Sequence, residues 1–222
     1  MQRMIETATR FKAVRLGAMA LATTLALAPV AAKAEFIGVL TGGTSGVYYP
    51  LGVAISKVIG ENVPDARPSV QSTKASVENL NLIEQGKGEV AFTLADSLAN
   101  GAQGNEEAGF KAPLKNVQAL GGIYPNYVQI VASADSGIKS ISDLKGKRLS
   151  VGAPKSGTEL NARAILGAAG ITYDDLGKVE YLPFAESVEL MKNRQIDATL
   201  QSAGLGVASI KDLANSVPIV VV

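Results

Sequence analysis

Residues 36–52, FIGVLTGGTSGVYYPLG, and residues 148–166, RLSVGAPKSGTELNARAIL, share one pattern, and this pattern decides the fold. Each stretch begins with a short apolar run typical of a strand, continues through a turn rich in Gly, Ser or Thr, and ends in an amphipathic helix. One copy lies in each half of the chain. The pattern predicts two α/β lobes with a ligand between them, because open α/β sheets bind ligands beyond the carboxyl ends of their strands.

Short β-rich runs alternate with helical patterns along most of the chain, which is typical of parallel sheets covered by helices. Two additional extended runs, 117–123 and 127–134, flank Pro125. The other expected strands are 36–40, 67–73, 89–94, 148–152, 179–182, 198–201 and 218–222. We predict an α/β fold of two lobes, 35–126 and 127–222, each with a β-sheet flanked by helices.

The first 34 residues are expected to be a secretory signal. A basic region up to Arg15 precedes the apolar run 16–30, and Ala32-Lys33-Ala34 supplies a small-x-small cleavage pattern. The alternative is a membrane anchor, but the run of 15 residues is shorter than the roughly 20 residues of a membrane span. We therefore expect cleavage after Ala34 and a periplasmic mature protein.

Charge and composition exclude several classes of function. Without residues 1–34 the chain has 16 basic and 19 acidic residues, a net charge of −3, and so lacks the basic surface typical of nucleic-acid or anionic-membrane binding. The absence of Cys and His excludes disulfides, Ser-His-Asp triads, cysteine nucleophiles and His/Cys zinc sites. We expect no cofactor, no metal, no nucleic-acid partner and a monomeric protein that binds a small organic anion.

The first turn, TGGTSG at 41–46, places backbone N–H groups at a helix start, where the helix dipole favours an anion. Gly43 allows close approach, Thr44 and Ser45 add hydroxyl donors, and Tyr48 can stack on the carbon chain of a ligand. The turn is not a P-loop, because the Gly-Lys-Ser/Thr ending is missing. The alternatives are simple helix capping and a tyrosine that belongs to the core.

Two later helix starts repeat this chemistry. Ser156, Gly157 and Thr158 are the second-lobe counterpart of the first turn, with hydroxyls that can donate to a carboxylate. Ser76 and Asn79 begin another helix, where ordinary capping alone explains them.

Taken together, four stretches resemble the TAXI family of TRAP-transporter solute-binding proteins, which includes bacterial immunogenic antigens. They are GVLTGGTSGVYYPLG (38–52), STKASVENLNLIEQGKGEVAFTLAD (72–96), GGIYPNYVQIVASADSGIKSISDLKGKRLSVGAPKSGTE (121–159) and, more loosely, MKNRQIDATLQSAG (191–204). The resemblance implies a type II periplasmic binding fold and a protein that is not an enzyme. It also implies hinge closure on a small carboxylate, such as glutamate or a C4-dicarboxylate, and delivery to a TRAP-type permease driven by an ion gradient.

The resemblance also implies which residues contact the ligand. These ligand-binding candidates are Gly43, Thr44, Ser45, Tyr48, Ser76, Asn79, Ser156, Gly157 and Thr158. The chain departs from the family at Gly206, where members often have Pro, and at its end, because members continue past the position of Val222. We therefore expect a C-terminally truncated chain whose first lobe lacks the returning segment that completes it.

Two other functions fit the same scaffold. An enzyme would need a titratable acid or base in the cleft, whereas the candidate turns offer hydroxyls and amides. A sensory or antigenic module would report the bound ligand to a membrane partner instead of a permease.

Overall fold

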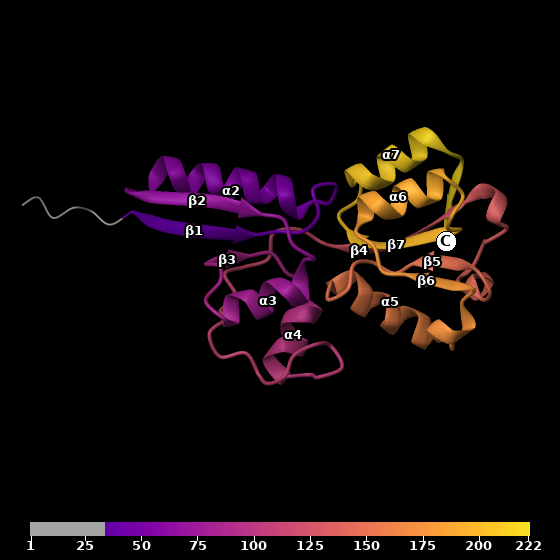
Figure 1. Ribbon diagram of the computed structural model, residues 1–222, viewed down its shortest axis with the longest axis horizontal. Coiled ribbons are helices and arrows are strands. Elements are labelled where there is room, and N and C mark those ends of the chain that lie inside the picture. The colour runs from indigo at the N-terminus through magenta and orange to yellow at the C-terminus, as the bar shows by residue number, and fades with distance from the viewer. Residues whose placement is uncertain (1–33) are drawn as a thin grey trace, which may run out of the picture. The chain divides into compact units, whose positions relative to one another are not determined.

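The computed structural model describes residues 34–222, so the expected signal lies almost entirely outside the described residues. Residues Glu35–Val222 form one compact unit that contains two β-sheets, each with helices on both faces (Figure 1). The predicted α/β fold of two lobes is therefore confirmed. Between residues 34 and 222, no helix combines the length and the apolar character that a membrane crossing requires.

The first lobe contains a parallel sheet of three strands in the order β2-β1-β3. Its strands are β1 (Glu35–Leu40), β2 (Ala66–Gln71) and β3 (Val90–Ala91). Its helices are α2 (Tyr48–Asn62), α3 (Ser76–Glu84) and α4 (Ala95–Gln103). Helix α2 covers one face of the sheet, and α3 and α4 lie on the other (Figure 1).

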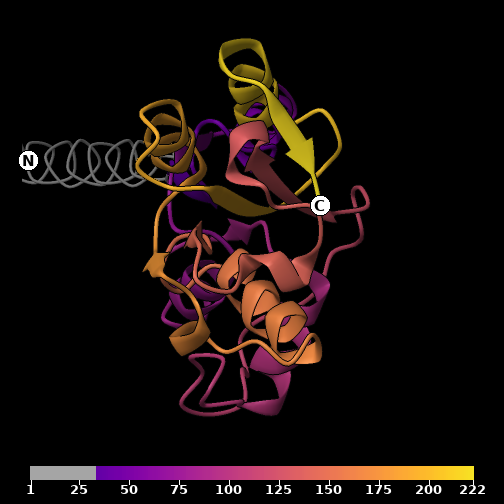
Figure 2. The same ribbon diagram turned by 90° about the vertical axis from the view of Figure 1, so that its right-hand side faces the viewer.

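The second lobe contains a mixed sheet of five strands in the order β6-β5-β7-β4-β8. Its strands are β4 (Tyr127–Ser133), β5 (Arg148–Ser150), β6 (Lys178–Glu180), β7 (Ala198–Ala203) and β8 (Ile219–Val221). Its helices are α5 (Gly157–Ala168), α6 (Phe184–Lys192) and α7 (Ala208–Ser216), with short 3₁₀ turns at Ala134–Ser136, Ile141–Leu144 and Tyr173–Asp175. Helix α5 lies on one side of the sheet, and α6 and α7 lie on the other (Figures 1 and 2).

Two expectations about the strands were wrong. The run 117–123 forms no strand, because Leu120 and Ile123 are 88 % and 59 % exposed and Gly121-Gly122 separates them. Strand β4 is antiparallel to both β7 and β8, so the second sheet is mixed instead of parallel. Residue periodicity reports which side chains are buried but carries no information about strand direction.

Apolar burial holds each lobe together. In the second lobe, one cluster that includes Leu149, Leu166 and Leu200 packs between the sheet and α5, and another that includes Val131 and Leu213 packs under α6 and α7. In the first lobe, a smaller cluster around Leu80 and Phe110 lies between α3 and the loop that follows α4. Leu160 of α5 packs against this first-lobe cluster, so the second lobe contributes to the core of the first.

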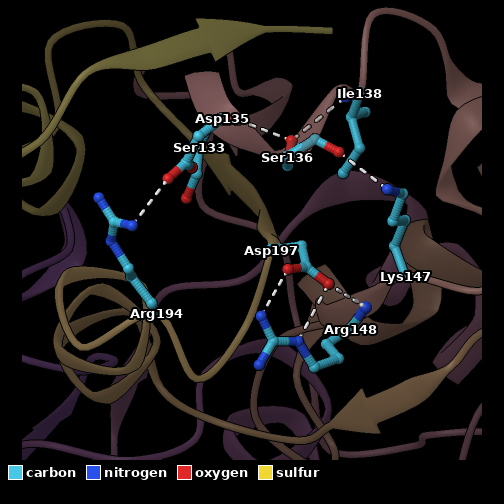
Figure 3. Close-up of polar contacts among 8 residues, drawn as sticks. All are labelled: Ser133, Asp135, Ser136, Ile138, Lys147, Arg148, Arg194 and Asp197. Atoms are coloured by element: carbon cyan, nitrogen blue, oxygen red, sulfur yellow. Dashed lines mark hydrogen bonds and ion pairs between the residues drawn. The ribbon is translucent and has the colours of Figure 1, made fainter.

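An ion pair joins the starts of β5 and β7, at the end of the second sheet opposite to the strand ends that lead to the other lobe. The Asp197 carboxylate accepts hydrogen bonds from the Arg148 backbone N–H (2.8 Å), from Nε (3.1 Å) and from Nη2 (2.6 Å). Figure 3 shows this pair beside the more exposed pair of Arg194 and Asp135. The hydrogen bonds from the Arg148 side chain are the main cause that lowers the pKa of Asp197 below its usual value.

This lowered pKa gives a predicted pH dependence. An Asp with a lower pKa in the folded protein contributes stability above its unfolded pKa of about 3.9, and this contribution is lost as the pH falls toward the folded pKa. The loss of unfolding free energy caused by Asp197→Asn should therefore be largest near neutral pH and shrink below about pH 4. Urea denaturation of both proteins across this range measures it. Asp135→Asn, which breaks only an exposed pair, should have little effect at pH 7. An effect of Asp197→Asn that does not change with pH would contradict the assignment.

Candidate functional site

Five helices begin at one pocket between the two lobes. The pocket has a volume of about 70 Å³. The residue that precedes each of α2, α3, α4, α5 and α6 lines it: Val47, Ala75, Leu94, Ser156 and Pro183. The first three belong to the first lobe and the last two to the second. The carboxyl ends of the strands thus lead into a shared site, as the repeated pattern in the sequence predicted.

Four of these five helix starts have no side-chain cap. Only α5 is capped, by Ser156, whose Oγ accepts from the Glu159 N–H at 3.1 Å. The positions before α2, α3, α4 and α6 make no capping hydrogen bond with their side chains. The first N–H groups of a helix have no partner inside the helix, and the positive end of the helix dipole lies with them. Convergence of such starts favours an anionic ligand.

A backbone hydrogen bond connects two of these helix starts across the lobes. The Glu78 N–H, in the first turn of α3, donates to the Lys155 carbonyl at 3.1 Å. Lys155 (φ 62°) and Ala75 (φ 71°, ψ −158°) both have a positive φ. The conformation of Ala75 is one that almost only Gly adopts, and such strain is typical of functional sites. Ala75 immediately precedes α3, and Lys155 precedes Ser156, the cap of α5.

Gly157 brings the lobes into direct contact. A Cβ atom at this position would lie 2.6 Å from Leu94 Cδ1, 2.7 Å from Ser76 Oγ and 2.8 Å from Ser97 Oγ, all in the first lobe. Only Gly allows this approach. Two further bonds span the lobes: the Ser209 N–H donates to the Ser45 carbonyl at 3.3 Å, and Arg163 Nη1 donates to the Glu107 carbonyl at 3.1 Å.

Aromatic side chains form one wall of the pocket. The Tyr48 ring stacks on Phe92 with centroids 5.2 Å apart and contacts the edge of Tyr124 at 6.3 Å. The Tyr48 hydroxyl is buried and makes no hydrogen bond of good geometry among the described residues, although the side chains of Ser76 and Asn126 lie near it and lower its pKa. Burial is the main cause that raises the pKa of Tyr48, so its hydroxyl stays protonated and able to donate.

The structure brings most of the sequence-derived candidates to this pocket. Those that line it are Gly43, Tyr48, Ser76, Ser156, Gly157 and Thr158. Thr44, Ser45 and Asn79 do not line it, and their contact with a ligand stays a prediction. Thr44 is exposed, while the carbonyl of Ser45 is used in the bond to Ser209.

Asn79 is fully buried inside the first lobe, and its side-chain amide is occupied. Its Nδ2 donates to the Thr41 carbonyl at 2.6 Å and to the Phe92 carbonyl at 2.8 Å, and its Oδ1 accepts from Thr73 Oγ1 at 2.6 Å. These bonds join α3 to the ends of β1 and β3. In this structure Asn79 therefore holds the strand ends that position the pocket.

Sequence reasoning missed several lining residues. They are Lys74, Tyr124, Pro183, Phe184 and Ser202, among others. Pro183 and Phe184 could have been found, because Pro at a helix start is a common signal and the second lobe was expected to contribute helix starts. Tyr124 could not, since it lies in a segment without regular structure.

The described residues offer no group suited to hold a metal ion. Within residues 34–222, no cluster of three or more His, Cys, Asp or Glu residues has the required arrangement. The chemistry at the pocket consists of N–H groups, hydroxyls, one lysine and apolar walls. Such a set can bind and orient a ligand.

Comparisons with known proteins agree with this architecture. The family model described as NMT1-like family matches residues 39–222. The alkanesulfonate-binding protein SsuA from Xanthomonas axonopodis pv. citri bound to MOPS is 17 % identical with a TM-score of 0.56 over 85 % of this chain. An ancestral arginine-binding protein bound to arginine is 17 % identical with a TM-score of 0.58 over 85 % of this chain. The periplasmic aliphatic sulphonate binding protein SsuA from Escherichia coli is 18 % identical with a TM-score of 0.51 over 84 % of this chain.

At these identities the solved structures show a shared fold, which is that of type II periplasmic binding proteins. The chain spans 61 % of the Xanthomonas protein, 56 % of the Escherichia coli protein and 78 % of the arginine-binding protein.

The role of Asn79 gives a stability prediction. Asn79→Ala leaves the Phe92 carbonyl without its side-chain donor, while Thr73 Oγ1 still donates to the Thr41 carbonyl. An unsatisfied buried group costs about 1–3 kcal/mol, so the unfolding free energy should fall by about this amount. Asn81→Ala is the matched control, because Asn81 is in the same helix but only partly buried, with bonds to Val77 and Gly109. Chemical denaturation measures both changes. Equal losses for the two variants would contradict the structural role of Asn79.

Proposed function

The chain belongs to the NMT1-like family, and on that premise we propose that it is a periplasmic solute-binding protein. It captures a small organic anion between two lobes, which we divide between residues 126 and 127, and delivers it to a membrane permease. The expected signal at 1–34 supports export. The solved structures of the same fold are binding proteins that, by their names, take alkanesulfonates or arginine, and they support a small organic ligand.

The observation that carries this proposal is the convergence of five helix starts, four of them without side-chain caps, on one pocket. Free N–H groups and helix dipoles can hold an anion without a buried arginine when water is excluded. A micromolar dissociation constant corresponds to about −8 kcal/mol. A few charge-assisted hydrogen bonds at about 1.5–3 kcal/mol each can supply this free energy after ordering costs are subtracted.

Hinge closure is the proposed mechanism. The anion first meets the helix starts of one lobe, and the other lobe then closes over it. The bond between Glu78 and Lys155 and the close contact at Gly157 form only when the lobes meet. The closed form is the one that the permease recognises.

Two kinds of permease remain candidates for the partner. The resemblance to the TAXI family favours a TRAP-type permease and a carboxylate such as glutamate or a C4-dicarboxylate. The shared fold with binding proteins of ABC transporters favours an ABC importer. Ligand uptake, measured in the cells that produce this chain and compared with a deletion of its gene, distinguishes the two. Dependence of the uptake on an ion gradient supports a TRAP-type permease, and dependence on ATP supports an ABC importer.

Ligand affinity should depend on the close contact at Gly157. In Gly157→Ala the new methyl group would overlap Ser76, Leu94 and Ser97, so the lobes cannot close fully. We expect the dissociation constant of a bound carboxylate, measured by calorimetry, to rise at least about tenfold, a loss of about 1.4 kcal/mol.

Gly167→Ala is the matched control for this variant. Gly167 lies in the same helix and has open space around it, so the substitution changes helix propensity without a clash. The control should bind like the original protein. Unchanged affinity in a folded Gly157→Ala variant would contradict closure at this contact.

A further inference from the structure

Within the described part of the chain, the pocket wall carries a single charged side chain, and its charge is positive. Lys74 is the only charged side chain that lines it, and within residues 34–222 no Asp, Glu or Arg does. Among nearby acids, Asp96 affects the titration of Tyr48, but it is exposed, lies outside the lining and accepts hydrogen bonds from the Ser97 N–H and hydroxyl. The pocket can therefore balance negative charge but offers no carboxylate to a cationic group.

The remaining wall is mostly apolar. The rings of Tyr48, Tyr124 and Phe184 line it together with Leu94 and Pro183. Apolar walls favour the part of a ligand that carries no charge, because its removal from water is favourable. The volume of about 70 Å³ favours a small ligand.

The buried hydroxyl of Tyr48 indicates which group donates a hydrogen bond to an oxygen atom of the ligand. The hydroxyl makes no hydrogen bond of good geometry among the described residues, although the Ser76 and Asn126 side chains lie near it and Asn126 Oδ1 is likewise unpaired. A ligand oxygen would give this donor a partner. Burial raises the pKa of this phenol, which keeps the proton available for donation. A carboxylate or sulfonate oxygen supplies the acceptor, whereas an ammonium group, which has only donors, cannot.

From this wall we infer that the preferred ligand is a small monoanion with an uncharged apolar body, and that amino acids are discriminated against because their ammonium group finds only neutral acceptors and no carboxylate among the described residues of the lining. The inference rests on the proposed function and narrows it. A carboxylate and a sulfonate share the required chemistry. The described residues of the lining offer no second lysine to a second carboxylate on the ligand.

The test is a calorimetric titration with two pairs of compounds that differ only in the α-ammonium group. The pairs are 4-methylpentanoate with L-leucine, and glutarate with L-glutamate; 3-methylbutane-1-sulfonate tests the sulfonate head group. We expect each compound without the ammonium group to bind at least tenfold more tightly than its partner. We also expect 4-methylpentanoate to bind at least tenfold more tightly than glutarate.

Different outcomes overturn different claims. If L-leucine or L-glutamate binds as tightly as its partner, or if glutarate binds as tightly as 4-methylpentanoate, the inference is wrong while anion capture stands. If none of the five compounds binds, the proposed function itself fails. If the sulfonate and 4-methylpentanoate bind with comparable affinity, the site accepts both sulfonate and carboxylate head groups. If one of the two binds tenfold more tightly, the site is specific for that head group. Both results agree with the proposed class of ligand.

A lysine variant tests the source of the charge preference. Lys74→Gln should weaken binding of 4-methylpentanoate by about two- to fivefold, the range for an exposed charge pair. The control is Lys87→Gln, because Lys87 is also exposed and lies outside the lining, and it should leave the affinity unchanged. An equal effect of both variants, or no effect of Lys74→Gln, would contradict the role of Lys74.

Discussion

Helix starts without side-chain caps are the constraint on which the site depends. The first N–H groups of a helix need acceptors from outside the helix, and five helices begin at residues that line the pocket between the two lobes. For Glu78 the acceptor is the Lys155 carbonyl of the opposite lobe. Closure of the lobes and binding of an anion thus both provide acceptors for backbone N–H groups at helix starts. The strained backbone of Ala75 and Lys155, at a cost of about 1–3 kcal/mol each, is offset by the contacts that closure forms.

Much of the fold follows from sequence pattern. The stretches 36–52 and 148–166 each predicted a strand, a turn and a helix, and the structure has β1 with α2 and β5 with α5 at these places. Apolar periodicity suffices here because both strands are central and both helices are amphipathic. It fails for the direction of β4, since an antiparallel strand and a parallel strand bury similar side chains. It also fails for 117–123, whose apolar residues are exposed.

The site was only partly accessible from the sequence. Glycine-rich and hydroxyl-rich turns pointed to Gly43 and Ser156, which line the pocket, although Ser156 also caps α5. The roles of Asn79 and Lys74 depend on which helix face meets which strand end, and this is decided by packing between segments distant in the chain. A polar residue three positions after a helix start has the same spacing whether it binds a ligand or, as Asn79 does, ties strand ends together.

Amide hydrogen exchange of Glu78, followed by NMR with and without saturating 4-methylpentanoate, tests the central claim most directly. The Glu78 N–H has its acceptor in the other lobe, so its protection reports closure at a single atom. The account predicts slower exchange of this amide when the anion is bound, while the amide of Val217, bonded to Leu213 within the second lobe, stays unchanged. An anion that binds without slowing the exchange of Glu78 would contradict the coupling of capture to closure.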